Sequence, residues 1–289
     1  MQKFFRDSIK LCFVGRFRSG KTWLLDSAYT ATGEIDGARY RIQTPILYGD
    51  VEGGTMSMPK MRRAIAEAGQ PLDNEHDVRY MGIHTEEDFD AFIAEARSGL
   101  YRLAIFDSWS KLYEDWAMLA RETGKHGKNR NASYNLEAAD AVAEALKKWF
   151  DLAVLPATRG MTLLSTAAIT DHFSGDLGNK VYLGERIAVS DRLQNRIVGG
   201  HAAIWHCHRE DPVPIQGEGG RVDIEATNAA IASGHLGPRF LVYTQAFAGM
   251  QYVKSQAGFA AEVPAIATGV DLGEVLSRHH DREGVHAFT

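Results

Sequence analysis

The sequence predicts a three-layer α/β fold built on a mostly parallel, twisted central sheet. Two observations carry this prediction. Short apolar segments alternate with helical patterns along most of the chain, and a phosphate-loop spacing separates the first apolar segment from the first helix. Towards the carboxyl end, apolar segments at 240–244 and 250–254 predict a β-hairpin. The 289 residues are enough for one large domain or two small ones.

Strands and helices are predicted in alternation. Continuous apolar runs that end at a glycine, an aspartate or a polar turn predict buried parallel strands. Apolar residues recurring every three to four positions between capping residues and glycines predict helices. The predicted strands cover residues 9–14, 46–48, 78–81, 103–106, 161–167 and 202–207. The predicted helices cover residues 23–29, 57–68, 85–96, 109–119 and 136–153.

Two regions fall outside this alternation. Residues 170–200 are polar, charged and rich in glycine, which predicts a long insertion or a mobile loop. The core is expected to span residues 1–260, and residues 261–289 are expected to form a C-terminal extension with a short helix and a tail.

The composition excludes several classes of protein. Apolar residues make up 45% and charged residues 24%, which excludes disorder. The longest apolar runs are far shorter than the roughly 20 residues of a membrane span, so no membrane partner is expected. Two cysteines and a start without the signal-peptide pattern indicate the reducing cytoplasm. The net charge of −5 excludes a basic coat over the whole surface, so any contact with nucleic acid must be local.

The segment Gly15-Arg16-Phe17-Arg18-Ser19-Gly20-Lys21-Thr22 has the spacing of a nucleotide phosphate loop. It follows a predicted strand and opens a predicted helix, whose amino terminus favours bound phosphate. In such a loop Lys21 bridges the β- and γ-phosphates of the nucleotide, and the hydroxyl of Thr22 holds Mg²⁺. Arg16 and Arg18 add positive charge and receive no individual role.

Carboxylates follow two of the other predicted strands. Asp107 ends the apolar strand 103–106, where a phosphate-loop enzyme needs a carboxylate for magnesium; capping the next helix is the alternative role. Glu52 follows the strand 46–48 and is the candidate for orienting or deprotonating a water molecule beside the γ-phosphate. Asp50 is the second candidate for this role. The alternative for both residues is a solvated carboxylate in an ordinary turn.

The order of these motifs resembles the core of RecA-like P-loop ATPases. The pattern from Asp50 to Gly54 is most similar to phage-encoded ATPases of single-strand annealing and recombination. The resemblance covers roughly residues 9–260. It implies ATP and Mg²⁺ as ligands, Glu52 as the catalytic glutamate, and a homo-oligomeric ring or filament in the host cytoplasm.

The resemblance also implies two loops that face single-stranded DNA, at residues 121–131 and 170–200. The first of them carries a net charge of +3, because one glutamate accompanies four basic residues. Those four residues are Arg121, Lys125, Lys128 and Arg130. Such a patch meets about three or four phosphates, so useful affinity requires several subunits on one strand. A solvated surface is the alternative for this patch.

Two positions depart from the family pattern. The polar residue that senses the γ-phosphate is missing at the end of the strand 161–167, where Thr166 or His172 is the candidate substitute. Near the carboxyl end, Lys254 matches the first residue of the Lys-x-Arg pair that relatives direct into a neighbouring subunit's nucleotide, but Gln256 replaces the arginine.

Three functions remain open on the sequence. The first is an ATPase that acts on single-stranded DNA in recombination, annealing or replication. The second is a phosphotransferase for a small molecule, with an arginine-bearing lid formed by Arg186, Arg192 and Arg196. The third is an interaction module that binds a nucleotide and hydrolyses little of it.

Overall fold

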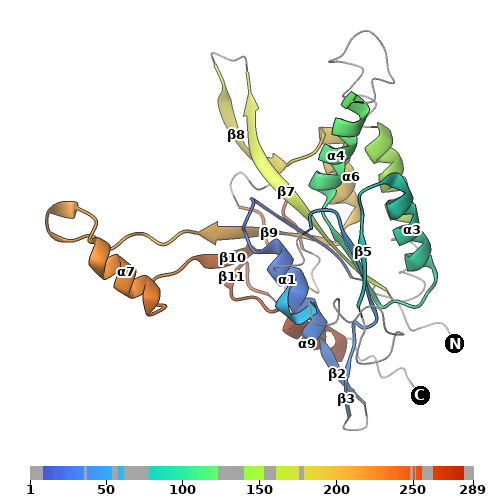
Figure 1. Cartoon of the computed structure of the whole chain (residues 1–289), viewed down its shortest axis with the longest axis horizontal. Helices are drawn as coiled ribbons and strands as arrows, with labels where there is room; N and C mark the ends of the chain where they lie inside the picture. Colours follow the sequence, from blue (N-terminus) through green and yellow to red (C-terminus); the bar gives the residue numbers. More distant parts are fainter. Residues whose placement is uncertain are drawn as a thin grey trace.

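One large mixed sheet organises the chain, and helices cover both of its faces (Figure 1). The computed structural model describes residues 9–35, 38–53, 58–61, 78–122, 140–152, 161–175, 179–247, 250, 252–255 and 263–282. The strands are β1 (Lys10–Gly15), β2 (Thr32–Ile35), β3 (Ala38–Arg41), β4 (Ile46–Asp50), β5 (Val78–Gly82), β6 (Leu103–Asp107), β7 (Thr162–Ser174), β8 (Val181–Ile187), β9 (Ala203–Glu210), β10 (Arg239–Tyr243) and β11 (Ile266–Thr268). The helices are α1 (Lys21–Ser27), η1 (Ala28–Thr30), α3 (Glu86–Arg97), α4 (Trp109–Glu122), α6 (Asp191–Gly200), η3 (Glu218–Gly220), α7 (Ile224–Ala232) and α9 (Leu272–Arg282), with a further helix at 140–152.

The large sheet has nine strands and is parallel over most of its width. Its order is β11-β10-β9-β1-β7-β6-β4-β5, and β8 pairs with the outer part of β7. From β9 to β5 neighbouring strands run parallel, whereas β8, β10 and β11 run antiparallel to their partners. The predicted α/β fold with a mostly parallel sheet is therefore confirmed, and each of the six predicted parallel strands is present.

Each face of the sheet has its own hydrophobic core, so the arrangement has three layers. On one face α3, α4 and α6 contribute buried side chains such as Phe92, Leu112 and Ile197. On the other face α1 and α9 contribute Leu24 and Leu276. Figure 1 shows these two groups of helices on opposite sides of the sheet. The strands between them are buried on both faces, which explains their continuous apolar sequences.

Residues 170–175 and 179–200 form mostly regular structure, so the predicted mobile loop is wrong. Strand β7 continues out of the sheet to Ser174 and returns as β8, and the helix α6 follows. The polar composition has a physical reason, because the hairpin projects from the body and is largely exposed (Figure 1). In α6 only Leu193 and Ile197 are buried, so its apolar stripe is too short to stand out in the sequence.

The predicted hairpin of residues 240–244 and 250–254 is also wrong in its pairing. Strand β10 is present, but its antiparallel partners are β9 and β11. Lys254 instead forms an isolated antiparallel bridge with Ile204 of β9. The correct partner of β10 lies more than twenty residues further along the chain, beyond the reach of a local turn pattern.

The segment after residue 261 packs onto the same body. Strand β11 pairs with β10, and the helix expected in this region is α9. Leu272 and Val275 of α9 are buried in the core that also contains Leu25 of α1. The backbone N–H of Leu272 donates to the hydroxyl of Ser27 at 2.8 Å, which fixes the start of α9 against the end of α1.

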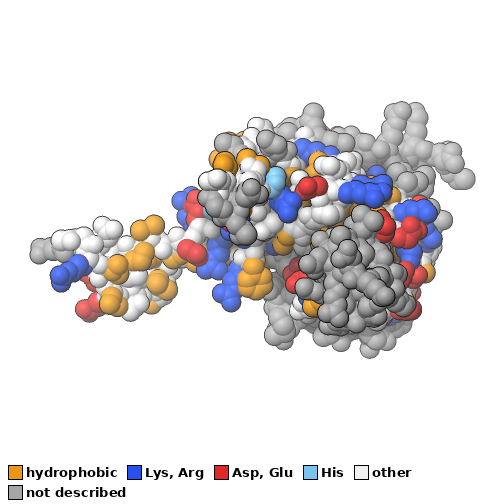
Figure 2. Space-filling view, turned by 90° about the horizontal axis from the view of Figure 1, so that it is seen from above, with side chains coloured by type: hydrophobic (Ala, Val, Ile, Leu, Met, Phe, Trp, Pro, Cys, Tyr) orange, Lys and Arg blue, Asp and Glu red, His pale blue; other side chains and the backbone are white. Residues whose placement is uncertain are grey.

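An arm formed by residues 211–238 extends away from the body between β9 and β10 (Figure 1). It carries α7, which buries none of its residues although most of them are apolar. Ile224 and Ile231 are 70% and 51% exposed, and Figure 2 shows hydrophobic side chains gathered along the arm. Within the arm, the side chain of Asp223 caps α7 by accepting from the N–H of Ala226 at 2.9 Å.

Some predicted features fall outside the part of the chain that the structure describes. Most of the predicted helix 57–68 lies there, as do residues 123–139. Among the described residues, no helix combines the length and the apolar character needed to cross a lipid bilayer.

Two histidines beside β9 are buried and neutral. Burial lowers the pKa of His201 to about 4, and burial also lowers the pKa of His206 to about 4. His201 accepts or donates through both ring nitrogens, at 2.9 Å from the hydroxyl of Ser165 and 2.7 Å from the carbonyl of Ile197. In the unfolded chain both imidazoles titrate near pH 6.5.

We expect acid to destabilise the fold through these histidines. Below pH 6.5 the unfolded chain binds protons that the folded histidines do not take up until about pH 4, so the free energy of unfolding falls as the pH falls through this window. Between pH 7 and pH 5 each histidine lowers the free energy of unfolding by about 1 to 2 kcal/mol. Denaturant unfolding at both pH values should show that His201→Gln loses less free energy of unfolding than the wild-type protein does. The variant His235→Gln, at an exposed position, should lose as much as the wild-type protein. An equal loss in His201→Gln would contradict this assignment.

Candidate functional site

The loop from Gly15 to Thr22 joins β1 to α1 at the carboxyl edge of the sheet. Its conformation needs glycine at two positions. A Cβ at Gly15 would collide with the carbonyl oxygen of Cys207 and the hydroxyl of Ser19. Gly20 has a φ of 88°, and a Cβ there would press on the ring of Phe240 at 3.0 Å. The glycines of the predicted phosphate loop are therefore required by its close packing.

Lys21 is buried and folded back along this loop. Its Nζ donates to the carbonyl oxygens of Gly15 and Arg16 at 3.0 and 3.1 Å. Among the described residues no carboxylate lies within ion-pair distance of Lys21, although its charge acts on the nearby Asp107. The hydroxyl of Ser19 is also buried and has no hydrogen-bond partner in the described part of the chain. A buried cation and an unsatisfied hydroxyl in one loop suit an anionic ligand such as phosphate.

Asp107, at the end of β6, is fully buried and accepts three hydrogen bonds. Thr22 donates to its Oδ2 at 3.1 Å and the hydroxyl of Tyr48 donates to the same atom at 3.4 Å. Thr166 donates to Oδ1. Burial, together with the nearby charge of Glu52, raises the pKa of Asp107 to about 6. The structure thus brings together Thr22 and Asp107, the two residues predicted to hold magnesium.

Glu52 lies just beyond the end of β4, and its side chain is exposed. Its carboxylate accepts from the hydroxyl of Ser108, and its backbone N–H lies 3.3 Å from the carbonyl oxygen of Asp107. The second candidate, Asp50, is buried. Its carboxylate accepts from the backbone N–H groups of Glu52 and Gly53 at 3.0 and 2.7 Å, and from Tyr80 at 3.1 Å. Asp50 therefore shapes the turn that presents Glu52 towards Asp107.

The two candidate phosphate sensors are placed differently. Thr166 is buried and in contact with Asp107, so it belongs to this cluster. His172 lies further along β7, in the projecting hairpin. Of the two, Thr166 is the residue that the structure places among the predicted site residues.

The arginines and the aromatic residue of the loop face outwards. Arg16 pairs with Asp171 and with Glu185, which belong to β7 and β8. The guanidinium of Arg18 lies over the ring of Phe17, 5.4 Å from its centre, and Phe17 is 82% exposed. These side chains form a rim of charge and aromatic surface around the buried Lys21.

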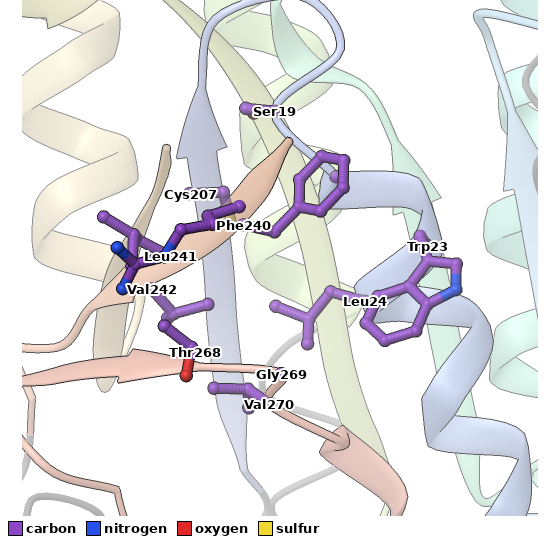
Figure 3. Close-up of a pocket in the computed structure, with 12 residues that line it drawn as sticks. Ser19, Trp23, Leu24, Cys207, Phe240, Leu241, Val242, Thr268, Gly269 and Val270 are labelled. Carbon is purple, nitrogen blue, oxygen red and sulfur yellow. The ribbon is translucent and has the colours of Figure 1, made fainter. Parts of the chain in front are cut away.

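A cavity of about 740 Å³ lies beside the loop (Figure 3). It opens between the amino-terminal end of α1 and the strands β10 and β11. The lining is mostly apolar and comes from widely separated segments. Its residues are Ser19, Gly20, Trp23, Leu24, Cys207, Arg239, Phe240, Leu241, Val242, Thr268, Gly269 and Val270. The sequence analysis missed this cavity, because no local pattern links residue 23 with residues 240 and 270.

The residues predicted to contact DNA are largely outside the described part of the chain. Lys125, Lys128 and Arg130 lie there, and Arg121 is in the last turn of α4. The second predicted DNA loop is the β7–β8 hairpin, whose exposed residues include Phe173 and Tyr182 with ring centres 5.6 Å apart.

Two further predicted groups have partners within the chain. The backbone of Lys254 pairs with Ile204, and partial burial lowers the pKa of its side chain. Of the predicted lid arginines, Arg186 pairs with Asp191 at 2.8 Å and Arg192 lies 3.7 Å from Asp140. Arg186 therefore lies on the hairpin and Arg192 on α6, and each is close to a carboxylate. This arrangement does not favour a phosphotransferase lid.

The oxygen atoms of this site fit a magnesium ion that is held mainly by phosphate and water and by few protein side chains. In the described part of the chain no three His, Cys, Asp or Glu side chains gather into a metal site. Thr22 and Asp107 nevertheless place a hydroxyl and a carboxylate side by side, at a carboxyl group crowded by negative charge. Magnesium typically takes one or two protein oxygens and completes its shell with water and phosphate oxygens. Thr22 and Asp107 are the residues that would hold it.

The sequence matches no family model, and comparison with curated proteins finds no significant match.

We expect the stability of Asp107→Asn relative to the wild-type protein to increase as the pH rises, and magnesium-dependent nucleotide binding to be abolished. The raised pKa of Asp107 means that ionisation is less favourable in the folded than in the unfolded chain, so the wild-type protein loses stability as the pH rises. The gain from the neutral amide should be about 1 kcal/mol larger at pH 8 than at pH 5. Denaturant unfolding at both pH values and nucleotide titration with and without Mg²⁺ measure the two effects.

The exposed Asp211→Asn is the matched control and should leave both quantities at the wild-type level. Retention of magnesium-dependent binding in Asp107→Asn would show that this carboxylate is not the metal ligand.

Proposed function

We propose that this protein is a magnesium-dependent ATPase of the RecA-like kind that acts on single-stranded DNA. The observation that carries the proposal is the 3.1 Å hydrogen bond from Thr22 of the loop to Asp107 of β6. It joins the loop that contains the buried Lys21 to the carboxylate of β6, which is separated from β1 by β7 alone. A phosphate-binding loop followed by a magnesium carboxylate at another strand end is the arrangement expected of nucleotide hydrolysis. This cluster contains side chains suited to bind a phosphate, a metal ion and a water molecule.

Each side chain has a distinct task in this proposal. Lys21 and the N–H groups at the start of α1 bind the phosphates. Bound magnesium would neutralise charge on the phosphate oxygens, and Thr22 and Asp107 would hold it. Glu52 orients the attacking water and takes its proton as the new oxygen–phosphorus bond forms and the bond from the γ-phosphorus to the bridging oxygen breaks. The Ser108 hydroxyl holds the Glu52 carboxylate during this transfer.

The cavity next to the loop suits the base and ribose of the nucleotide. It adjoins Ser19 and Gly20, so a nucleotide whose phosphates occupy the loop extends into it (Figure 3). Trp23 and Phe240 are its aromatic rings, and Thr268 and Arg239 are among its few polar side chains. An apolar cleft of this kind holds a flat ring by contact area and gives modest discrimination between purines.

Two substitutions separate binding from hydrolysis. Lys21→Met keeps the aliphatic volume but removes the buried charge, so nucleotide affinity should fall about 10- to 100-fold. Glu52→Gln should keep the affinity and lower the rate of phosphate release about 100-fold. Isothermal titration and a steady-state phosphate assay measure these quantities, with Glu225→Gln on the exposed α7 as the control.

If Lys21→Met binds nucleotide as well as the wild-type protein, the loop is not a nucleotide site. If Glu52→Gln hydrolyses ATP at the wild-type rate, the protein is better described as a nucleotide-binding interaction module. A phosphorylated small molecule among the products, in place of free phosphate, would instead identify a phosphotransferase.

The β7–β8 hairpin is the element we propose for contact with single-stranded DNA. It projects from the carboxyl edge of the sheet, on the same side as the loop, and its strands are tied to the loop through Arg16 (Figure 1). Phe173 and Tyr182 expose aromatic rings on which bases can stack without sequence preference. The contacts of one hairpin are few, so binding by a homo-oligomer is part of the proposal.

We expect the double variant Phe173→Ala and Tyr182→Ala to weaken binding of a fluorescent oligothymidylate about tenfold and to reduce its stimulation of ATP hydrolysis. Loss of two stacking surfaces is the physical reason. Fluorescence anisotropy and the phosphate assay at low salt measure the two effects. Phe173→Tyr with Tyr182→Phe, which retains both rings, should behave as the wild-type protein. ATP hydrolysis that does not respond to DNA in the wild-type protein would remove DNA from the proposed function and leave the nucleotide site intact.

A further inference from the structure

Arg16 joins the nucleotide loop to both strands of the projecting hairpin. Its Nε and Nη2 donate to Oε1 of Glu185 at 3.1 and 2.9 Å, and Nη2 also pairs with Asp171. Asp171 of β7 and Glu185 of β8 are direct partners in the antiparallel register. One guanidinium therefore bridges the two strands at the base of the hairpin and attaches them to the loop.

Without Arg16 this base would carry an unfavourable pair of charges. Two carboxylates directly opposite each other on neighbouring strands repel and destabilise the pairing. His206 lies 3.8 Å from Glu185, but its lowered pKa leaves it neutral at pH 7. Within the described part of the chain, Arg16 is then the charged cation within ion-pair distance of Asp171 and Glu185 at that pH.

The pairing of the two hairpin strands becomes irregular immediately beyond the Arg16 contacts. The register shifts between His172 and Phe173, the residues next to Asp171. Strand β7 pairs with β1 as far as Ala168, and past the irregularity the two strands project from the body (Figure 1). Val181 and Tyr182 near the tip are 59% and 55% exposed, so packing contributes little there. The Arg16 contacts therefore lie at the base of the hairpin, next to the part that projects from the body.

Arg16 is also placed where a bound triphosphate would compete for it. It is the second residue of the loop that contains Lys21, and its side chain is 55% exposed, so it can move without unpacking the core. A guanidinium binds phosphate with the same planar, two-donor geometry that it uses for carboxylate. A nucleotide phosphate chain presents several charged oxygens, which compete with the two carboxylates for the guanidinium.

We propose that Arg16 exchanges between the carboxylates of Asp171 and Glu185 and the phosphates of a bound nucleotide, so that nucleotide binding releases the base of the β7–β8 hairpin. The inference rests on the proposed nucleotide site and adds a means of transmitting its occupancy. Because such coupling is reciprocal, a partner that holds the hairpin base closed weakens nucleotide binding by the same factor.

Hydrogen exchange of the full-length protein tests the inference. Backbone amides of residues 169–187 are followed by mass spectrometry with Mg²⁺, in the absence and presence of saturating ADP or a non-hydrolysable ATP analogue. The wild-type hairpin should exchange about two- to fivefold faster with the nucleotide, as expected for loss of a partly exposed ion pair. In Arg16→Ala the exchange should be fast in both conditions and independent of the nucleotide.

A second variant distinguishes an exchanging arginine from a purely structural one. Asp171→Asn with Glu185→Gln removes the competing carboxylates and keeps polar side chains of the same size. Nucleotide affinity, measured by isothermal titration, should then rise about two- to fivefold, and the hairpin should no longer respond to nucleotide. Arg186→Gln is the matched control on β8, because Arg186 pairs with Asp191 and not with the loop.

The outcomes separate this inference from the nucleotide site itself. Nucleotide binding without any change in hairpin exchange overturns the role of Arg16 and leaves the site standing. An unchanged or weaker affinity in the Asp171→Asn and Glu185→Gln variant also overturns it. Failure of the wild-type protein to bind either nucleotide overturns the proposed function as well.

Discussion

Burial of one carboxylate, that of Asp107, is the constraint around which the candidate site is organised. Its three donors come from the loop at the start of α1, from β7 and from β4, through Thr22, Thr166 and Tyr48. Strands β7 and β4 are the neighbours of β6 on its two sides. A buried carboxylate without partners costs several kcal/mol, so the loop and both flanking strands are held in the positions that supply those partners. Asp107 thereby sets the distance between the loop and the strand ends.

The charges in this region are arranged for a ligand more than for stability. Asp50, Glu52 and Asp107 lie at adjacent strand ends, and the mutual repulsion raises the pKa of Asp107. Lys21 is buried nearby but turns back to the carbonyls of its own loop. Separate groups of negative and positive charge in one site are unfavourable when it is empty and become favourable when a metal ion and an anion occupy it.

Features set by local spacing were predictable from the sequence, and features set by long-range pairing were not. The loop from Gly15 to Thr22 and the buried strands follow from short patterns of glycine and apolar residues, and Asp107 and Glu52 follow from their positions after those strands. The cavity is lined by residues as far apart in the sequence as Trp23 and Phe240, and no local pattern links them. The polar composition of the β7–β8 hairpin predicts a loop, but polarity in a projecting ribbon reflects exposure and says nothing of backbone order.

The arm of residues 211–238 has a topological consequence. Glu210 and Arg239, where the arm leaves and rejoins the sheet, are partners in the β9–β10 register. The arm is thus an insert in what would otherwise be a tight turn between adjacent antiparallel strands, and the sheet requires no hydrogen bond from it. Such a segment can be lengthened, shortened or exchanged during evolution while the remainder of the chain keeps its architecture.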